Sequence, residues 1–569
     1  RNDLLWAKPI GDSSTDRLTL SQSTIDSEMN VISAGVTSKS TATTNLGWDD
    51  WLITKHGPSG ELIWQKQIGS STVDTTADVA VDSNDNIYVF GHTVVANGGT
   101  FDGVTVSKSG HANNPTWVLA KFDKDGNRQW LKSIDKSGSS GAYGVAKAMD
   151  VEGTAVYIAG YNDGTQVNQV EKYDLNGNKQ ATIDLTPPTN SAFTTQKPWL
   201  VDLDATSNGV YVTSYRRNGS TVAGKLTRLD NNLSSEVWQV QPSGNYQIFQ
   251  LKVLPNGNIV TRQSLYGGDS TDPQSQPMNI YSPSGSLVSS ADYRTNTTTR
   301  QSNTGSDYGS IAVDSANNML FMQWDRSDRV QSYIVKYDSS GNFVYEKKLP
   351  PNFRVRSLSL RQNSAGEEFI YVNGDHYLSH NHSQGQVTFN NSSSFVGRIS
   401  NNSVAAASST PGFASIKFEL ATATTHNVYV CPRYSGSYIT TGIVSDELVV
   451  HPAGPAPSST DYINSCLYLR KFSSTSDTQR QYYQLEFYAI QDNASDSNQT
   501  IPITFSVISD DSTYNGMSLP TVNVTVENAS VSAPNAPVNL EATASGTTNT
   551  LTWQKPYMTG LGEGVQSYT

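Results

Sequence analysis

The sequence predicts an all-β protein, and its composition, its strand-like alternation and its internal repetition support that prediction. Ser, Thr, Asn and Gly are abundant, and charged residues make up 16 % of the 569 residues, below the roughly 25 % of an average protein. This balance suits many short strands joined by polar turns and disfavours helices, which prefer Ala, Leu, Glu and Lys. A chain of this length usually forms roughly three or four domains.

Net charge and hydropathy exclude two classes of partner. The net charge of −12 gives an acidic surface, which repels phosphate backbones, so we expect no nucleic-acid partner. No apolar run approaches the ~20 residues that span a membrane, so we expect no membrane insertion. The chain starts at Arg1 without a visible signal peptide, and we expect a processed chain or part of a longer protein. Cys431 and Cys466 fit either one disulfide or two buried thiols.

A repeated unit runs through the first 400 residues. Residues 50–93 divide into four alternating, strand-like pieces, and the breaks between them carry Gly, Asn, Asp and Pro, the residues that tolerate hairpin turns. Comparable units occupy 117–161, 168–215, 224–264, 278–324 and 333–374. Repetition of a four-stranded unit is the signature of a radial array of small sheets.

A seventh unit is divided between the two ends of this region. Residues 395–400 (FVGRIS) match the start of a unit and then the repeat stops, while residues 4–11 (LLWAKPIG) match its continuation, with Trp6 equivalent to Trp64. A ring closed in this way leaves no free end to peel open and only short edges. The sequence therefore predicts a seven-bladed β-propeller with a split closing blade over residues 1–400.

Two short patterns recur within the units. The first, K-[YF]-D-x-x-G-x-x-x-W, is found at Lys121, Phe122, Asp123, Gly126 and Trp130. The second combines G-x-x-x-D with A-V-D-x-x-x-N-x-Y-V-x-G and is carried by Gly69, Asp74, Ala80, Val81, Asp82, Asn86, Tyr88, Val89 and Gly91. Together they resemble the bacterial and phage β-propeller repeat often called SBBP, over about two thirds of the chain. The resemblance implies blade architecture and says almost nothing about chemistry.

Two further β domains are expected after the ring. Residues 401–412 are small and polar and predict a linker. Seven alternating runs over 413–531 predict an Ig-like β-sandwich. Residues 532–569 resemble the start of a fibronectin type III domain, with Trp553 as its core tryptophan. Such a domain needs about 100 residues, so we expect the given chain to end inside it.

Exposed aromatic residues beside acids are the candidate ligand site. Trp48, Asp49 and Asp50 form one group, and Trp324 and Asp325 form another. An exposed indole ring with polar neighbours can stack on a sugar, as in lectins. The alternative interpretation is that these tryptophans pack one blade against the next.

The candidate metal ligands are three histidines. His376, His380 and His382 lie close together in the chain, and a His-x-His pair in an extended segment points both rings to one side, as metal binding requires. The alternative is a polar loop whose histidines face water. Acidic turns such as those at Asp82 and Asp123 raise the question of calcium, but they lack the later bidentate acid of a full calcium loop. We therefore assign no cofactor and leave calcium or a transition metal open.

No motif of a known catalytic class is present. We predict a non-enzymatic structural and adhesion component on a phage particle or similar extracellular appendage, multimeric within its assembly. Its expected partners are other structural proteins of that assembly and a host surface glycan or protein. The alternative is a secreted or cell-surface bacterial adhesin that binds carbohydrate. A glycan-active enzyme is a third hypothesis, and it would need a carboxylate pair or a metal on one face of the ring.

Overall fold

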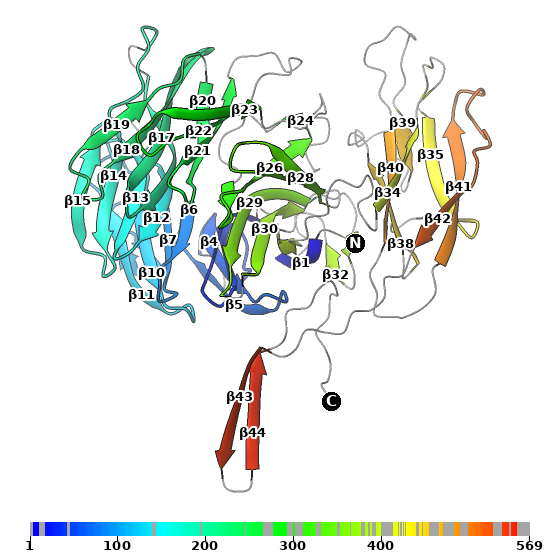
Figure 1. Cartoon of the computed structure of the whole chain (residues 1–569), viewed down its shortest axis with the longest axis horizontal. Coiled ribbons are helices and arrows are strands. Elements are labelled where there is room, and N and C mark those ends of the chain that lie inside the picture. Colours follow the sequence, from blue (N-terminus) through cyan, green and yellow to red (C-terminus); the bar gives the residue numbers. More distant parts are fainter. Residues whose placement is uncertain are drawn as a thin grey trace.

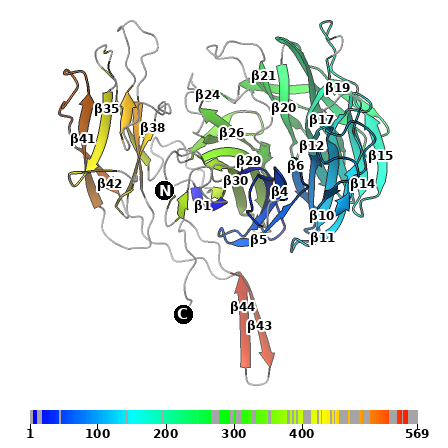
Figure 2. The ribbon, with the colours of Figure 1, turned by 180° about the vertical axis from the view of Figure 1, so that it is seen from behind.

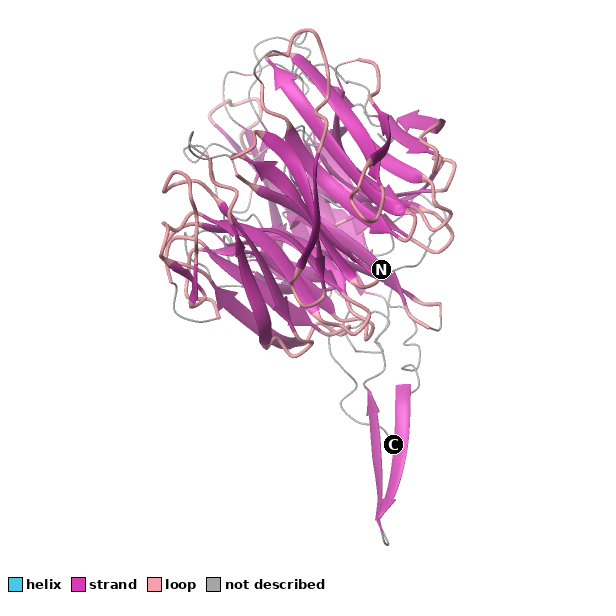
Figure 3. Ribbon diagram, turned by 90° about the vertical axis from the view of Figure 1, so that its left-hand side faces the viewer, coloured by secondary structure: helices cyan, strands magenta, loops and turns pink. Residues whose placement is uncertain are grey.

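The structure, a computed structural model, contains strands and no helices among the residues that it describes, and therefore no helix there that could cross a membrane (Figures 1 and 3). These residues are 4–10, 18–42, 46–138, 144–193, 196–244, 246–265, 277–292, 300–301, 311–325, 332–349, 353–364, 366–376, 382–384, 387–389, 394–399, 413–418, 420, 424, 426, 428–439, 443–445, 448–453, 466–469, 483–489, 499–526, 538–545 and 548–554.

The described part of residues 4–399 forms seven antiparallel sheets of four or five strands, here called sheets 1 to 7. Sheet 1 consists of β2 (Leu18–Ile25), β3 (Val31–Thr37), β4 (Asp50–His56) and β5 (Leu62–Ile68). Sheet 2 consists of β6 (Asp74–Val81), β7 (Ile87–Thr93), β10 (Thr116–Phe122) and β11 (Arg128–Ile134). Sheet 3 consists of β12 (Ala146–Glu152), β13 (Ala155–Asn162), β14 (Val167–Asp174) and β15 (Lys179–Asp184).

The same order, from an inner to an outer strand, continues through the later sheets. Sheet 4 consists of β16 (Trp199–Thr206), β17 (Gly209–Asn218), β18 (Thr221–Leu229) and β19 (Glu236–Val240), and sheet 5 of β20 (Tyr246–Val253), β21 (Ile259–Leu265), β22 (Pro277–Tyr281) and β23 (Leu287–Asp292). In sheet 6, β24 (Arg300–Gln301) and β25 (Ile311–Val313) both pair with β26 (Met319–Asp325), which is followed by β27 (Ser332–Tyr337) and β28 (Phe343–Lys348). Two short hairpins, β8 (Thr100–Phe101) with β9 (Val104–Thr105) and β31 (His382–Gln384) with β32 (Val387–Phe389), lie in loops.

Sheet 7 joins the two ends of the ring region. It runs β29 (Phe353–Gln362), β30 (Glu368–His376), β33 (Ser394–Ile399) and β1 (Leu4–Ile10), so the N-terminal strand is its outermost strand. β1 pairs antiparallel with β33. The inner strands contact one another in the order β2, β6, β12, β16, β20, β25 and β29, and β29 contacts β2 (Figures 1 and 2). The predicted pairing of the N-terminus with the last unit is present in the structure.

The sequence units are displaced by two strands from the sheets. The unit read from residues 50–93 contains β4 and β5 of sheet 1 and β6 and β7 of sheet 2. Residues 69–73, which resemble a hairpin turn, instead carry the chain from the outermost strand of one sheet to the innermost strand of the next. A repeat in a sequence has no intrinsic first strand, so its spacing predicts the number of strands but not where a sheet begins.

A tryptophan on the outermost strand fastens several sheets to the next one. The indole N–H of Trp64 donates to the carbonyl oxygen of Lys124 in the turn between β10 and β11, at 3.2 Å. The same contact recurs as Trp6 to Pro58, Trp130 to Leu175 and Trp238 to Pro283, at 2.8, 3.2 and 3.0 Å. In each of these turns the indole lies against a glycine with positive φ. The K-x-D-x-x-G-x-x-x-W pattern therefore encodes contact between sheets.

We expect Gly126→Ala to destabilise the ring more than Gly153→Ala. Both glycines have positive φ, 83° and 57°, which costs a residue with a Cβ atom about 1–2 kcal/mol. A Cβ at Gly126 would lie 3.2 Å from the ring of Trp64, whereas a Cβ at Gly153 would meet nothing within 4 Å. The crowded variant should lose about 1 kcal/mol more, measured by urea unfolding. Equal losses would contradict a tight seat for the tryptophan.

The remaining described strands form a second β unit and a separate hairpin. One sheet runs β34 (Phe413–Phe418), β40 (Tyr483–Ala489), β38 (Leu448–Ala453) and β37 (Ile443–Ser445); the other runs β36 (Ser437–Tyr438), β35 (Val428–Tyr434), β41 (Gln499–Ser509) and β42 (Val522–Val526), with β39 (Leu467–Leu469) on β35. The two sheets share a core in which Phe418 and Phe505 pack 5.5 Å apart. The hairpin is β43 (Val538–Ser545) with β44 (Thr548–Gln554).

The two cysteines form a disulfide. Cys431 lies on β35, and Cys466 immediately precedes β39, which pairs with β35. Of the two alternatives left open by the sequence, the structure contains the bonded one. A cross-link over a separation of 35 residues stabilises a fold by about 3–4 kcal/mol in the chain-entropy model.

Candidate functional site

A cavity of about 380 Å³ lies where the inner strands of the seven sheets meet. Six of these strands carry a β-bulge near their start, and the extra residue at each bulge lines the cavity. These residues are Ser21, Ala77, Lys147, Val201, Phe249 and Arg356. Because a bulge locally re-aims side chains, the same irregularity in six inner strands brings one extra residue of each to the cavity.

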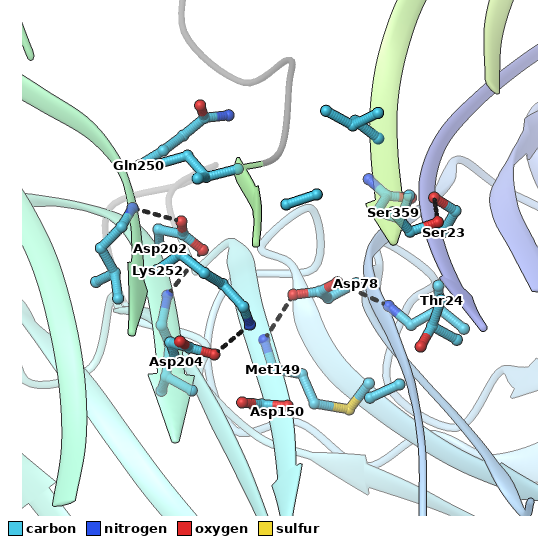
Figure 4. Close-up of a pocket in the computed structure, with 18 of the residues that line it drawn as sticks. Ser23, Thr24, Asp78, Met149, Asp150, Asp202, Asp204, Gln250, Lys252 and Ser359 are labelled. Carbon is cyan, nitrogen blue, oxygen red and sulfur yellow. Dashed lines mark hydrogen bonds and ion pairs between the residues drawn. The ribbon is translucent and has the colours of Figure 1, made fainter. Parts of the chain in front are cut away.

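Four aspartates from three successive inner strands line one side of this cavity (Figure 4). Asp78 lies on β6, Asp150 on β12, and Asp202 and Asp204 on β16. Each carboxylate accepts a backbone N–H from the inner strand of the following sheet. The donors are Met149 at 3.0 Å, Ala205 at 2.8 Å, Leu251 at 2.9 Å and Val253 at 2.6 Å, in the same order. The aspartates thus tie sheets 2, 3, 4 and 5 together.

Lys252 supplies a positive charge to this cluster. Its Nζ lies 2.6 Å from Oδ1 of Asp204. Burial disfavours the charged ammonium, but the carboxylates of Asp204 and Asp150 outweigh that effect, so the pKa of Lys252 lies above its ordinary value. The other side of the cavity is hydroxyl-rich: Ser23 bonds to Ser357 and Ser359 at 2.8 and 3.0 Å.

Burial raises the pKa of three of the carboxyl groups towards neutrality. It raises the pKa of Asp78 to about 6 and that of Asp202 to about 7. For Asp150, burial and then the nearby charge of Asp204 raise the pKa to about 8. Near pH 7 the cluster is therefore partly protonated, because burial and the repulsion between neighbouring carboxylates outweigh the attraction of Lys252.

Adjacent carboxyl groups with pKa values near 7 are suited to proton transfer. Here, however, each of the four carboxylates also holds a backbone amide of the next sheet, so moving a proton or a substrate onto it competes with a contact between sheets. We therefore regard the cluster first as a structural device.

Sequence reasoning missed these four aspartates because they come from separate units. Asp78 and Asp150 are 72 positions apart in the chain, and nothing local shows that they share a cavity. A signal was present, since an acid recurs within otherwise apolar strands such as ADVAVD and LVDLDAT. A carboxylate in such a place needs a partner, and the partner is the backbone of the next sheet.

The structure separates the members of the predicted Trp48 group. The side chain of Trp48 is 75 % exposed, whereas Asp49 and Asp50 are buried. Oδ2 of Asp50 accepts hydrogen bonds from the backbone N–H of Leu46 at 3.0 Å and from Nε2 of Gln67 at 2.7 Å. Of this group, Trp48 alone presents its side chain to a ligand.

The other predicted site residues lie at the limits of the described structure. Trp324 and Asp325 end β26, His376 ends β30 and His382 begins β31. Their side chains, and the whole of His380, lie outside the described residues. The second ligand group and the histidine metal site therefore stay predictions. Within the described part of the chain, no three His, Cys, Asp or Glu side chains form a metal-binding group.

The acidic turns bond to their own backbone. Oδ1 of Asp82 accepts the N–H groups of Asn84 and Asn86 at 2.9 and 3.0 Å. Asp123 and Asp174 make the equivalent pair of contacts within their turns. These carboxylates thus stabilise the turns in which they lie.

Comparison with known proteins identifies the repeat type. The model of the family "Beta-propeller repeat" (SBBP) matches residues 63–99, so the chain contains β-propeller repeat sequence. No curated protein matches the chain.

Among solved structures, Raptor from Chaetomium thermophilum is similar with a TM-score of 0.41 and 8 % identity, over 70 % of this chain and 29 % of that one. A subtype N10 neuraminidase-like protein of A/little yellow-shouldered bat/Guatemala/060/2010 is similar with a TM-score of 0.34 and 10 % identity. The similarity covers 57 % of this chain and 92 % of that one. A protein of unknown function from Dyadobacter fermentans is similar with a TM-score of 0.36 and 11 % identity. The similarity covers 57 % of this chain and 95 % of that one.

Proposed function

We propose that this chain is a non-enzymatic structural and adhesion component of an extracellular assembly, such as a phage particle or a similar surface appendage. The observation that carries the proposal is the use of its polar groups. The aspartates of the central cavity and the residues of the repeat pattern hold neighbouring sheets together. A molecule that commits its most reactive groups to its own rigidity is suited to presenting a surface.

We propose further that the ring is a seven-bladed β-propeller with a split closing blade. The repeat match, the seven sheets and the cyclic contacts of their inner strands support this reading. The two-sheet unit is proposed to be an Ig-like sandwich within residues 413–531, and the final hairpin the start of a fibronectin type III domain within 532–569. The shared core and the pairing of β43 with β44 support these assignments.

The extracellular location rests on the disulfide and the surface composition. Disulfides form and persist in oxidising compartments and are rare in the cytosol, and Cys431 is bonded to Cys466. The polar, acidic composition favours a displayed protein that stays soluble among many copies.

Cryo-electron microscopy of the native assembly tests the structural role. We expect several symmetry-related copies, held by contacts with other structural proteins of the same assembly. A chain that is found only as a free monomer in the medium would contradict the proposal. The alternative, a secreted or cell-surface bacterial adhesin that binds carbohydrate, is favoured by the exposed ring of Trp48.

A glycan-active enzyme is the competing function, and the aspartates of the central cavity are the observation in its favour. Asp150 and Asp204 are close enough to influence each other's protonation, as paired acids in glycosidases do. Turnover of a polysaccharide that Asp150→Asn abolishes, in a variant that folds normally, would favour this enzyme over the structural proposal.

A further inference from the structure

We propose that one face of sheet 4, formed by Trp199, Tyr215 and Arg217, binds an anionic polysaccharide. The inference rests on the proposed adhesive function and names a ligand class for it. Here this surface is called the sheet 4 patch. It is separate from the central cavity and from Trp48.

The patch begins with a flat aromatic pair. Trp199, the first residue of β16, lies opposite Tyr215 of β17 in the strand register. The two rings are stacked, with centroids 6.5 Å apart and planes 17° apart. The indole of Trp199 is 36 % exposed, unlike the fully buried Trp51 and Trp117. An exposed aromatic ring is a surface against which the C–H face of a sugar ring packs.

Arg217 extends the same face. It follows Tyr215 by two residues on β17, and alternate residues of a strand point to the same side, about 7 Å apart. Arg217 is exposed, and its Nε donates to the carbonyl oxygen of Gly219 at 3.1 Å. β17 continues past the end of its pairing with β16 and turns into β18, which places this guanidinium beyond the aromatic pair. A guanidinium recognises carboxylate and sulfate groups by paired hydrogen bonds.

The chain segments that form this face are locally basic. Residues 185–199 and 209–225 contain four Lys or Arg residues and no Asp or Glu, although the whole chain has a net charge of −12. Lys197 is paired with buried Asp163 at 3.3 Å, and Lys225 is itself buried. The positive charge on this face therefore comes from Arg217. A guanidinium on the same face as an exposed aromatic ring favours an anionic ligand over a neutral one.

Arg216 supports the patch from the opposite face of β17. Its guanidinium lies 5.8 Å from the ring centre of Phe193, and its Nε donates to the carbonyl oxygen of Gln196 at 2.8 Å. These contacts hold the segment that leads into Trp199, so the aromatic pair starts from a fixed position. Arg216 is a positioning residue, and the test therefore leaves it unchanged.

Binding of the full chain to dextran sulfate and to unmodified dextran of the same length tests the proposal. Sulfate is the only difference between these probes. We expect salt-sensitive binding to dextran sulfate and at least tenfold weaker binding to dextran. Trp199→Ala and Arg217→Ala should each reduce affinity for dextran sulfate about tenfold, the scale of one lost aromatic or charge-assisted contact.

Two matched variants serve as controls. Phe343→Ala removes another exposed aromatic ring, and Lys124→Ala removes an exposed positive charge from a turn of sheet 2. Both variants should keep wild-type affinity. Arg217→Glu reverses an exposed charge near the end of β17 and covers the case in which Trp199→Ala fails to fold. Equal binding of both polymers, no binding, or the same loss in Lys124→Ala would overturn the sheet 4 patch. Because native cryo-electron microscopy is a separate measurement, these outcomes do not decide the structural role.

Discussion

Deletion of residues 1–11 is expected to destabilise the whole ring rather than one edge of it. The deletion removes β1, which pairs with β33 from Leu4 to Ile10. It also removes Ala7 and Ile10, which belong to two different core clusters. Since the inner strands contact one another in a cycle, loss of the outer strand of sheet 7 weakens the one junction that joins the two ends of the region.

Trp6→Ala is the single-residue version of this experiment. Trp6 donates to the carbonyl oxygen of Pro58 in sheet 1, and its ring lies 5.9 Å from that of Tyr371. Removing a packed tryptophan costs about 3 kcal/mol or more, measured by chemical unfolding. The exposed Trp48→Ala should change stability by no more than about 0.5 kcal/mol. If the deletion and Trp6→Ala both melt at the temperature of the intact chain, closure through β1 is wrong.

The ring is expected to lose stability as the pH rises from about 6 to 9. The carboxyl groups of Asp78, Asp202 and Asp150 have folded-state pKa values of about 6, 7 and 8, above the ordinary value of about 3.9. The unfolded chain has already lost these protons below pH 6, whereas folding retains them, so each loses its stabilising proton as the pH passes through its folded pKa. We expect a loss on the order of 2–4 kcal/mol, after allowance for water in the cavity.

Two buried histidines oppose this effect on the acid side of the same profile. Burial lowers the pKa of His56 and of His92 to about 4, below the ordinary value of about 6.5. As the pH falls from 6.5 to 4, the unfolded chain binds protons that the folded chain does not, so stability falls. Below about pH 6.5 the two histidines therefore offset most of the loss that the three carboxyl groups cause, so the net loss of stability is expected mainly above that pH.

Urea unfolding at several pH values measures this profile. The triple variant Asp78→Asn, Asp150→Asn and Asp202→Asn keeps an oxygen that can accept each backbone N–H but cannot ionise, so its stability should change much less between pH 6 and 9. Asp125→Asn, at an exposed turn acid, is the control and should keep the wild-type slope. If the free energy of unfolding of the wild type stays constant or rises above pH 7, the aspartates of the central cavity are fully ionised in the folded chain and the prediction is wrong.

Strand content and ring closure could be predicted from sequence because both are local patterns. Alternation marks each strand, and the equivalence of Trp6 to Trp64 relates the N-terminus to the repeat. The two-strand displacement of the units could not be predicted, since a turn such as 69–73 has the same residue types whether it joins strands of one sheet or of two.

The candidate site was much less accessible to sequence reasoning. The Trp48 group was predicted because its members are adjacent in the chain. However, Trp48 lies in the loop before β4, whereas Asp50 begins that strand and is buried where Trp48 is exposed. The four aspartates of the central cavity were not predicted because they are far apart in the chain. They lie near one another only after separate sheets have met around the cavity.

The position of β1 has a consequence for synthesis in the cell. The backbone N–H of Leu20, which follows β1, bonds to the hydroxyl of Ser394, 374 residues further along the chain, at 3.0 Å. At about 5–20 residues per second, a ribosome needs roughly 20 to 75 s to make the partner after the first strands have emerged. During that delay β1 is an unpaired strand with apolar side chains, exposed to mispairing with neighbouring nascent chains. Sheet 7, which closes the finished ring, is therefore also the sheet whose unpaired first strand a chaperone would need to shield during synthesis.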